Sequence, residues 1–183
     1  MNGLYEFDLT VFRAINVGLH HSWLNPIFAV FSYFGLGIVI GSACLLFLLS
    51  KSTRHFVIPL ILADAVSGWV VADGLKFLIP RDRPSNLSWA IAQEPHRLSS
   101  FPSGHTTTAF AIATMLVFLT RNTKYRTLGY LSYLIAALIG FSRIYRGVHW
   151  PTDVLAGACF GIATSCALYL VLPQFRTKRV RPA

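Results

Sequence analysis

Charged side chains are scarce in this sequence: Asp, Glu, Lys and Arg make up 13% of its 183 residues, whereas 54% are hydrophobic. About a quarter of the residues of a typical soluble domain are charged, so this low share excludes an ordinary soluble fold. The net charge of +9 would point to nucleic acid in a soluble protein. Here the charges lie between apolar segments, which favours membrane topology and indicates no nucleic acid partner.

Cysteine is also rare, and Cys44, Cys159 and Cys166 all lie inside apolar runs. They leave no disulfide framework outside the membrane. Residues 1–22 lack the basic start and small-residue cleavage site of a signal peptide, so we expect the N-terminus to be retained. No repeat, linker or low-complexity segment divides the chain, which predicts one integral membrane domain over residues 1–183.

The apolar runs predict an all-α fold, a polytopic membrane helix bundle over residues 26–172. The predicted five transmembrane helices cover residues 26–49, 56–79, 106–120, 127–141 and 154–172. The first two are long enough for a hydrocarbon core of about 30 Å. The third and fourth span about 23 Å each, so their polar ends should lie at or just below the head-group level.

The N-terminal segment, residues 1–22, has an amphipathic pattern. A helix over residues 4–19 places Leu4, Phe7, Val11, Ile15 and Leu19 on one face and Glu6, Thr10 and Arg13 roughly opposite. This pattern predicts an interfacial helix lying in the membrane plane. A helix packed on the bundle, as in soluble proteins, remains the alternative.

Basic residues indicate the orientation. With five spans, the turns 51–55 and 121–126 and the tail 173–183 lie on one face, where they carry nine basic residues and no acidic one. The positive-inside tendency makes this face cytoplasmic. The sequence therefore predicts a multi-pass protein of the bacterial cytoplasmic membrane, with a cytoplasmic C-terminus and a site that opens to the periplasm or exterior.

On the outward side, the stretch from Phe101 to His105 opens the third span. A helix start offers unpaired backbone N–H groups and the positive end of the helix dipole, and so binds anions. We expect Ser103 to act as the N-cap and Gly104 to let a ligand approach the backbone. His105 projects from the first turn, where it can exchange protons.

A second histidine precedes the fifth span. Pro151 suits the first helical position, which leaves Asp153 within the first turn. From there its carboxylate can reach the ring of His149. A carboxylate on one ring nitrogen fixes the tautomer and leaves the other nitrogen as a nucleophile.

Three cations accompany these histidines: Lys76 and Arg83 at the end of the second span, and Arg143 at the end of the fourth. A metal site would need more carboxylates or thiolates and fewer positive neighbours. The cations suit the oxygens of a phosphoryl group in its transition state. The sequence therefore predicts phosphoryl transfer without a metal.

Together these motifs resemble the signature of the type 2 phosphatidic acid phosphatase (PAP2) family, which includes membrane lipid phosphatases. The matching segments are Lys76-x6-Arg83-Pro84, Pro102-Ser103-Gly104-His105 and Ser142-Arg143-x5-His149-x3-Asp153. The resemblance implies that His149 forms a phosphohistidine oriented by Asp153, and that His105 protonates the leaving oxygen and later activates water. It also implies a phosphate site, without metal or cofactor, made by Lys76, Arg83, Ser103, Gly104 and Arg143.

The expected partners are the bilayer and a lipid phosphate. Undecaprenyl diphosphate is the preferred substrate, lipid A 1-phosphate is close behind, and phosphatidylglycerol phosphate also fits. A lipid phosphotransferase using the same intermediate and a non-enzymatic anion-conducting protein remain alternatives. Arg146 either binds a second phosphate or is a solvated loop arginine, and loop charges such as Glu94 are expected to be solvated.

Overall fold

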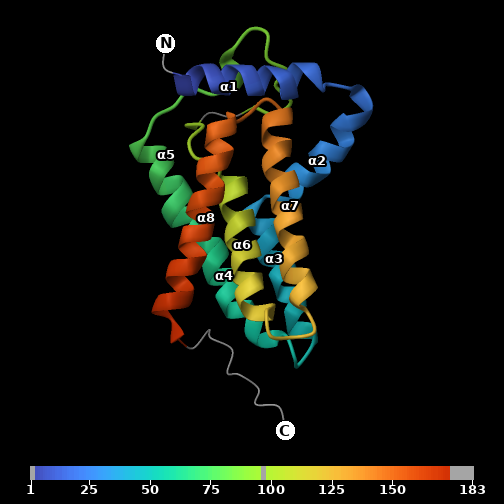
Figure 1. Ribbon diagram of the computed structural model, residues 1–183, viewed down its shortest axis with the longest axis vertical. Coiled ribbons are helices and arrows are strands. Elements are labelled where there is room, and N and C mark those ends of the chain that lie inside the picture. The colour runs from blue at the N-terminus through green and yellow to red at the C-terminus, as the bar shows by residue number, and fades with distance from the viewer. Residues whose placement is uncertain (1–2, 96–97, 174–183) are drawn as a thin grey trace.

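The computed structural model describes residues 3–95 and 98–173, which form helices and connecting segments without a strand (Figure 1). The basic tail predicted at 173–183 lies outside these residues beyond Pro173. The α-helices are α1 (Gly3–Arg13), α2 (Asn25–Phe34), α3 (Gly37–Cys44), α4 (Val57–Ala65), α5 (Gly74–Leu78), α6 (Gly104–Thr120), α7 (Arg126–Tyr145) and α8 (Pro151–Val171). Stretches of π-helix cover Ala14–Gly18 and Val66–Asp73, and short 3-10 turns cover Ser22–Leu24, Leu45–Leu49, Arg54–Phe56 and Pro84–Asn86.

Helix α6 forms the centre of the bundle. It packs against α8, α7 and α4, and 11 of its 17 residues are buried. Helix α8 approaches closely at two glycines. A Cβ on Gly157 would lie 2.8 Å from Ser103 O, and one on Gly161 would lie 2.2 Å from Thr107 O. Glycine is therefore required at both positions, because any side chain would push α8 away from α6.

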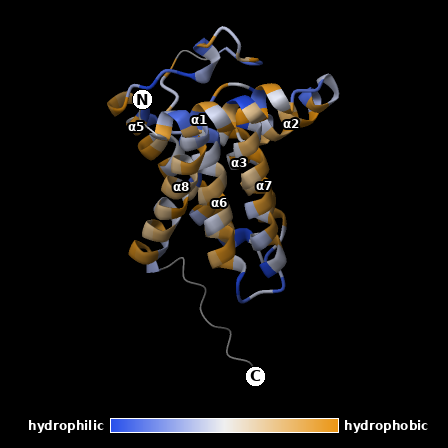
Figure 2. Cartoon of the chain, turned by 45° about the horizontal axis from the view of Figure 1, so that its top comes forward, coloured by the Kyte–Doolittle hydropathy of each residue, from blue (hydrophilic) through white to orange (hydrophobic). Residues whose placement is uncertain are grey.

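Three helical stretches are long and apolar enough to span a membrane: Arg54–Leu78, Arg126–Tyr145 and Pro151–Val171. The predicted spans 56–79, 127–141 and 154–172 largely coincide with them. Helix α6 is a shorter apolar helix. Apolar residues cover the shafts of α6, α7 and α8, with polar residues gathered toward the ends (Figure 2). The count of five membrane spans stays a prediction.

The predicted transmembrane helix over residues 26–49 is broken in the structure. The chain bends by 65° between Ser22–Phe34 and Gly37–Leu49, so this pair counts as a fourth span only if it is taken as one broken helix. Gly35 lies at the bend, where a Cβ would come within 2.6 Å of Ile139 Cγ2 and 2.8 Å of His105 Cδ2. Close packing on α6 and α7 at this glycine accompanies the bend, which hydropathy alone does not reveal.

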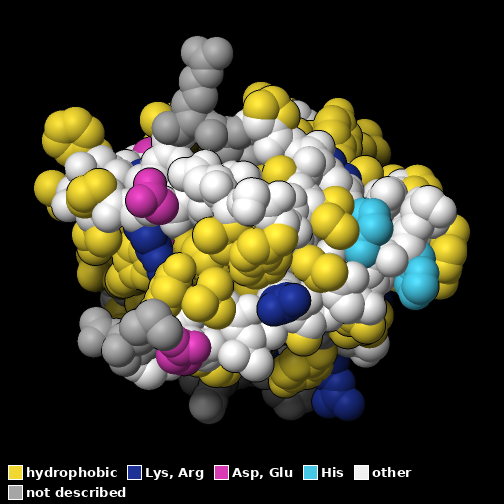
Figure 3. All heavy atoms as spheres, turned by 90° about the horizontal axis from the view of Figure 1, so that it is seen from above, with side chains coloured by type: hydrophobic (Ala, Val, Ile, Leu, Met, Phe, Trp, Pro, Cys, Tyr) yellow, Lys and Arg dark blue, Asp and Glu magenta, His cyan; other side chains and the backbone are white. Residues whose placement is uncertain are grey.

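Helix α1 and the π-helical stretch after it cover most of the predicted N-terminal helix, and α1 lies across one end of the bundle, over α7 and α8 (Figure 1). Its buried residues are Asp8, Phe12 and the following Asn16, spaced four apart. The predicted apolar stripe is divided: Leu4, Phe7 and Leu19 are exposed. Ile15 of the same stripe packs against the buried cluster that contains Phe12. Seen from above, many hydrophobic side chains lie on this end of the molecule (Figure 3). Membrane contact by this stripe stays a prediction.

Candidate active site

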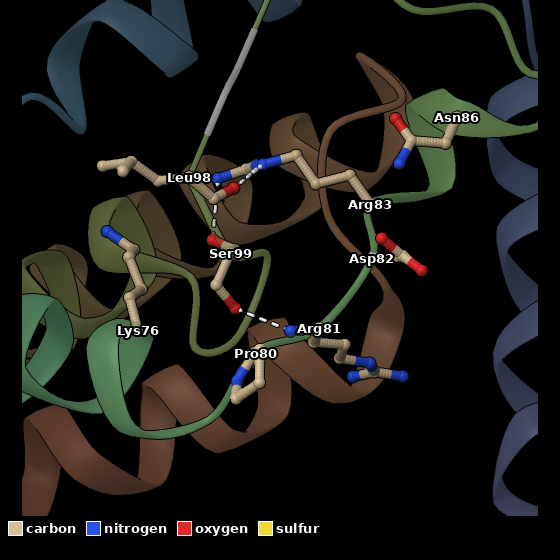
Figure 4. A pocket seen from close by; sticks show the side chains of 8 residues that line it. All are labelled: Lys76, Pro80, Arg81, Asp82, Arg83, Asn86, Leu98 and Ser99. Carbon is tan, nitrogen blue, oxygen red and sulfur yellow. Dashed lines mark hydrogen bonds between the residues drawn. The ribbon is translucent and has the colours of Figure 1, made fainter.

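The end of the bundle that carries α1 contains a polar pocket of about 540 Å³. Its lining comes from α5 and the segment that follows it: Lys76, Pro80, Arg81, Asp82, Arg83, Asn86, Leu98 and Ser99 (Figure 4). Three of these side chains are cationic, so the pocket suits an anion. Neither His105 nor His149 lines it directly. Arg83 makes the connection, since it lines the pocket and also reaches His149.

His149 and Asp153 form the pair predicted from their spacing. Helix α8 begins at Pro151, and Asp153 Oδ2 caps it by accepting a hydrogen bond of 2.9 Å from Trp150 N. The same Oδ2 lies 3.5 Å from His149 Nδ1, and both side chains are buried. His149 Nε2 lies 3.4 Å from Arg83 Nη1. One ring nitrogen therefore faces a carboxylate and the other a guanidinium.

Backbone carbonyls hold the guanidinium of Arg83 in place. Its nitrogens donate to Leu98 O at 2.8 Å, Val148 O at 2.7 Å and Ser99 O at 3.0 Å. Burial, and to a lesser extent the positive charge of Arg143, lowers the pKa of Arg83 to about 10. Arg83 is still positively charged at neutral pH, so it brings a fixed cation beside His149.

Lys76 and Gly104 lie side by side at the start of α6. A Cβ on Gly104 would lie 3.1 Å from Lys76 Nζ, so the glycine leaves room for the ammonium group at the helix N-terminus. Lys76 Nζ also donates to Asp73 Oδ1 at 2.9 Å, and its side chain is only 16% exposed. The structure therefore places Lys76 beside the backbone of Gly104, two of the residues predicted to bind phosphate.

The expected side-chain cap by Ser103 is absent. Ser103 is the N-cap residue of α6, but its hydroxyl accepts a hydrogen bond of 2.9 Å from Thr106 Oγ1 and caps no backbone N–H. Its own backbone N–H donates to Asp153 O at 3.1 Å, which joins the starts of α6 and α8. His105 follows in the first turn, partly exposed, with its ring against Gly35.

Arg143 is fully buried at the end of α7, where Glu94 binds it. Glu94 Oε1 and Oε2 each lie 3.0 Å from one terminal nitrogen of Arg143, and Ser32 Oγ also accepts from Nη1. Glu94 Oε1 is 2.5 Å from Arg146 Nε, and Arg146 Nη1 donates to Gln93 at 3.0 Å. The expectations of a solvated Arg146 and a solvated Glu94 are therefore wrong, because the two loops that carry them pack together.

Sequence reasoning missed a chain of ion pairs that ends at Asp153. The Nη1 atom of Arg81 lies 2.5 Å from Asp153 Oδ1, and its Nη2 atom lies 2.5 Å from Asp8 Oδ2. Asp8 is fully buried and also accepts from the Thr152 N–H at 2.9 Å and from its hydroxyl at 2.6 Å. Helix α1 thereby binds directly to the start of α8.

Asn16 makes a second connection from the N-terminal segment. Its side-chain amide donates to Ile91 O and Tyr145 O, and its side-chain oxygen accepts from Ile91 N. The four-residue spacing of Asp8, Phe12 and Asn16 is the sequence signal that could have marked this buried face.

Within residues 3–95 and 98–173, no three His, Cys, Asp or Glu side chains gather as metal ligands would. Three carboxylates near the pocket are bound to cations instead: Asp73 to Lys76, Glu94 to Arg143, and Asp153 to Arg81. The donor set fits an anion better than a metal ion.

Comparison with known proteins identifies the family. Residues 56–177 match the PAP2 superfamily model. The chain is 29% identical over 181 residues to the bacitracin transport permease protein BcrC of Bacillus licheniformis, covering 92% of this chain and 82% of the relative. It is 30% identical over 158 residues to an undecaprenyl-diphosphatase of Sulfolobus acidocaldarius, covering 85% and 73%. The crystal structure of Aquifex aeolicus LpxE superimposes with a TM-score of 0.76 at 35% identity, covering 87% of this chain and 93% of that one. The chain therefore belongs to the PAP2 superfamily and is a phosphatase of that family.

Proposed function

We propose that the protein is a metal-independent lipid phosphatase that acts through a phosphohistidine. The observation that carries this proposal is the position of the His149 ring between Asp153 and Arg83. Asp153 keeps the proton on Nδ1 and leaves the Nε2 lone pair available. Arg83 lies where a phosphoryl oxygen would gain negative charge.

In the first step, His149 Nε2 forms a bond to phosphorus while the bond from phosphorus to the leaving oxygen breaks. His105 donates a proton to that oxygen. In the second step, His105 takes a proton from water, the resulting hydroxide attacks phosphorus, and the P–N bond breaks. Inorganic phosphate leaves and both histidines return to their initial states. Lys76, Arg83 and Arg143 stabilise the charge on the phosphoryl oxygens, with Ser103 and the backbone at Gly104 as further donors.

An apolar cavity of about 340 Å³ supports a lipid substrate. Its walls come from α2, α3, α4, α6 and α7 and from the 3-10 turn Leu45–Leu49, and they include Phe34, Ile40, Phe47, Ala109, Leu116 and Ile139. Ile139 and His105 both contact the bend at Gly35, so the cavity runs close to the proposed proton donor. A lipid tail in this cavity would bring its phosphate toward the cations.

Undecaprenyl diphosphate is the substrate we favour. The name of the Sulfolobus relative supports it, and Arg146 adds a cation for a second phosphate beside Arg143. Lipid A 1-phosphate and phosphatidylglycerol phosphate belong to the same class. We further propose that the site faces the periplasm or exterior, because the basic turns 51–55 and 121–126 lie at the opposite end of the bundle.

The test uses purified protein in lipid nanodiscs with a panel of these lipids and measures release of inorganic phosphate. We expect His149→Asn to abolish release and to remove an acid-labile phosphoprotein trapped from labelled substrate. His55→Asn, an exposed histidine at the other end, is the matched control and should change neither. Phosphate release by His149→Asn at the wild-type rate would disprove the scheme.

Two alternatives remain, and the same assay separates them. A phosphotransferase would label a second lipid and release little phosphate. A transport protein, suggested by the name of the Bacillus licheniformis relative, would keep its function in His149→Asn.

A further inference from the structure

The carboxylate of Glu94 occupies the cation cluster at the end of α7. Its two oxygens lie 3.0 Å from the two terminal nitrogens of Arg143, a bidentate arrangement. Oε1 is also 2.5 Å from Arg146 Nε and accepts a hydrogen bond of 3.0 Å from Ser32 Oγ. The Arg143 side chain is fully buried whereas that of Glu94 is 23% exposed. The carboxylate therefore lies on the solvent side of the guanidinium.

A carboxylate and a phosphate present the same pair of oxygens to a guanidinium fork. Both cannot bind the same edge of Arg143 at once. We propose that Glu94 is an internal competitor for the phosphate site, which the phosphate of the lipid displaces from Arg143. This inference rests on the proposed function, because it takes Arg143 as a phosphate ligand.

When the carboxylate of Glu94 leaves Arg143, Arg146 remains as its cationic partner. Its Nε binds Glu94, while its Nη1 and backbone oxygen bind Gln93. Glu94 and Gln93 belong to a segment without regular secondary structure. A small rotation of the Glu94 side chain can therefore break the two contacts with Arg143 and keep the one with Arg146.

Internal competition raises the dissociation constant of every anion by the same factor, since only the fraction of molecules with Arg143 uncovered can bind. The terminal phosphate of a substrate carries about −1.5 to −2 charges near pH 7 and binds strongly enough to overcome this factor. The phosphodiester groups of bulk phospholipids carry a single charge and bind more weakly. Glu94 therefore keeps abundant bilayer lipids from occupying the site.

The test compares wild type with Glu94→Gln, which removes the charge and keeps the shape. Methyl phosphate and dimethyl phosphate serve as probes of the two phosphate classes. Their dissociation constants are measured by calorimetry with His149→Asn added to both proteins, so that methyl phosphate is not hydrolysed. We expect both constants to fall by about tenfold in the variant, and by the same factor. Glu6→Gln, the same change on the exposed face of α1, should leave both constants unchanged. If Glu94 only holds Arg143 in position, binding of both probes will weaken, and that result would overturn the proposal.

Activity in vesicles gives a second readout. With phosphatidylglycerol, a phosphodiester, added to the bilayer at increasing fraction, Glu94→Gln should lose turnover while wild type keeps it. Equal sensitivity of the two proteins to phosphatidylglycerol would contradict the proposed exclusion of bulk lipids.

Loss of the Glu94 charge leaves Arg143 buried without its carboxylate, which lowers stability. Thermal unfolding still tests the proposal in a destabilised variant, because the shift caused by phosphate is measured within each protein. Inorganic phosphate should raise the melting temperature of Glu94→Gln more than that of wild type. An equal or smaller rise would count against the proposal. Phosphate binding without turnover in wild type would refute the proposed function alone, whereas absence of phosphate binding in both proteins would refute both.

Discussion

The ion pairs from α1 to Asp153 predict a specific effect of Asp8→Asn. Asp8 is fully buried and binds Arg81 and both donors of Thr152. Removing one partner of a buried ion pair costs about 3–5 kcal/mol of unfolding free energy. Arg81 is 25% exposed and keeps Asp153 as its other partner, so we expect a loss near the lower limit, about 3 kcal/mol.

The same substitution should lower turnover without weakening substrate binding. With Asp8 neutral, Asp153 is the remaining carboxylate partner of Arg81, which draws this carboxylate away from His149. Loss of such a supporting partner typically costs about tenfold or more, so we expect kcat to fall about tenfold. The KM should stay unchanged, because Asp8 does not line the pocket.

The assay is phosphate release in nanodiscs across a pH series, together with thermal unfolding, for wild type, Asp8→Asn and the exposed control Glu6→Gln. The pH at which the rising limb of the kcat profile is half-maximal should move in Asp8→Asn, because the environment of the His149 ring changes. If Asp8→Asn is destabilised but keeps the wild-type kcat and the wild-type pH profile, α1 has only a structural role. That result would refute the proposed effect of Asp8 on His149.

Three further predictions follow from the site. Gly35→Ala places a Cβ 2.8 Å from His105 Cδ2 and should lower kcat about tenfold, whereas Gly3→Ala, with no neighbour within 4 Å, should not; an active Gly35→Ala enzyme would show that the His105 ring tolerates displacement. Since the pKa of Arg83 is lowered to about 10, its charge is present below that pH and lost above it, so inhibition by inorganic phosphate should weaken as the pH rises through about 10. Disappearance of this transition in Lys76→Met would assign it to the lysine. Vanadate should inhibit competitively and EDTA should leave turnover intact; inactivation by EDTA that a divalent ion reverses would rule out the metal-free scheme.

The parts of the site that the sequence predicted are those fixed by short-range geometry. His149 and Asp153 lie four residues apart around a helix start, and Pro151 marks that start, so their proximity follows from helical geometry. The positions of Lys76 and Gly104 relative to each other were predicted from the order of the motifs and the expected family.

Contacts between distant segments were not predictable in this way. Arg81 and Asp8 are 73 positions apart, and Glu94 and Arg143 are 49 apart. No local periodicity relates such residues, so loop charges that bind buried arginines looked like ordinary solvated ones. The bend at Gly35 was missed for the same reason, because it depends on packing against α6 and α7.

The close union of α6 and α8 divides the site into a fixed and an adjustable part. The backbone N–H of Ser103 donates a hydrogen bond to Asp153 O, and the two helices pack closely at Gly157 and Gly161. The proposed nucleophile His149 and the proposed amide donors at the start of α6 thus belong to one rigid unit. Under the proposed function, we expect adaptation to head groups of different size to come from α5 and from residues 79–95 and 98–103. Substitutions there should change which lipid is preferred, whereas substitutions between α6 and α8 should lower the turnover of every lipid by a similar factor.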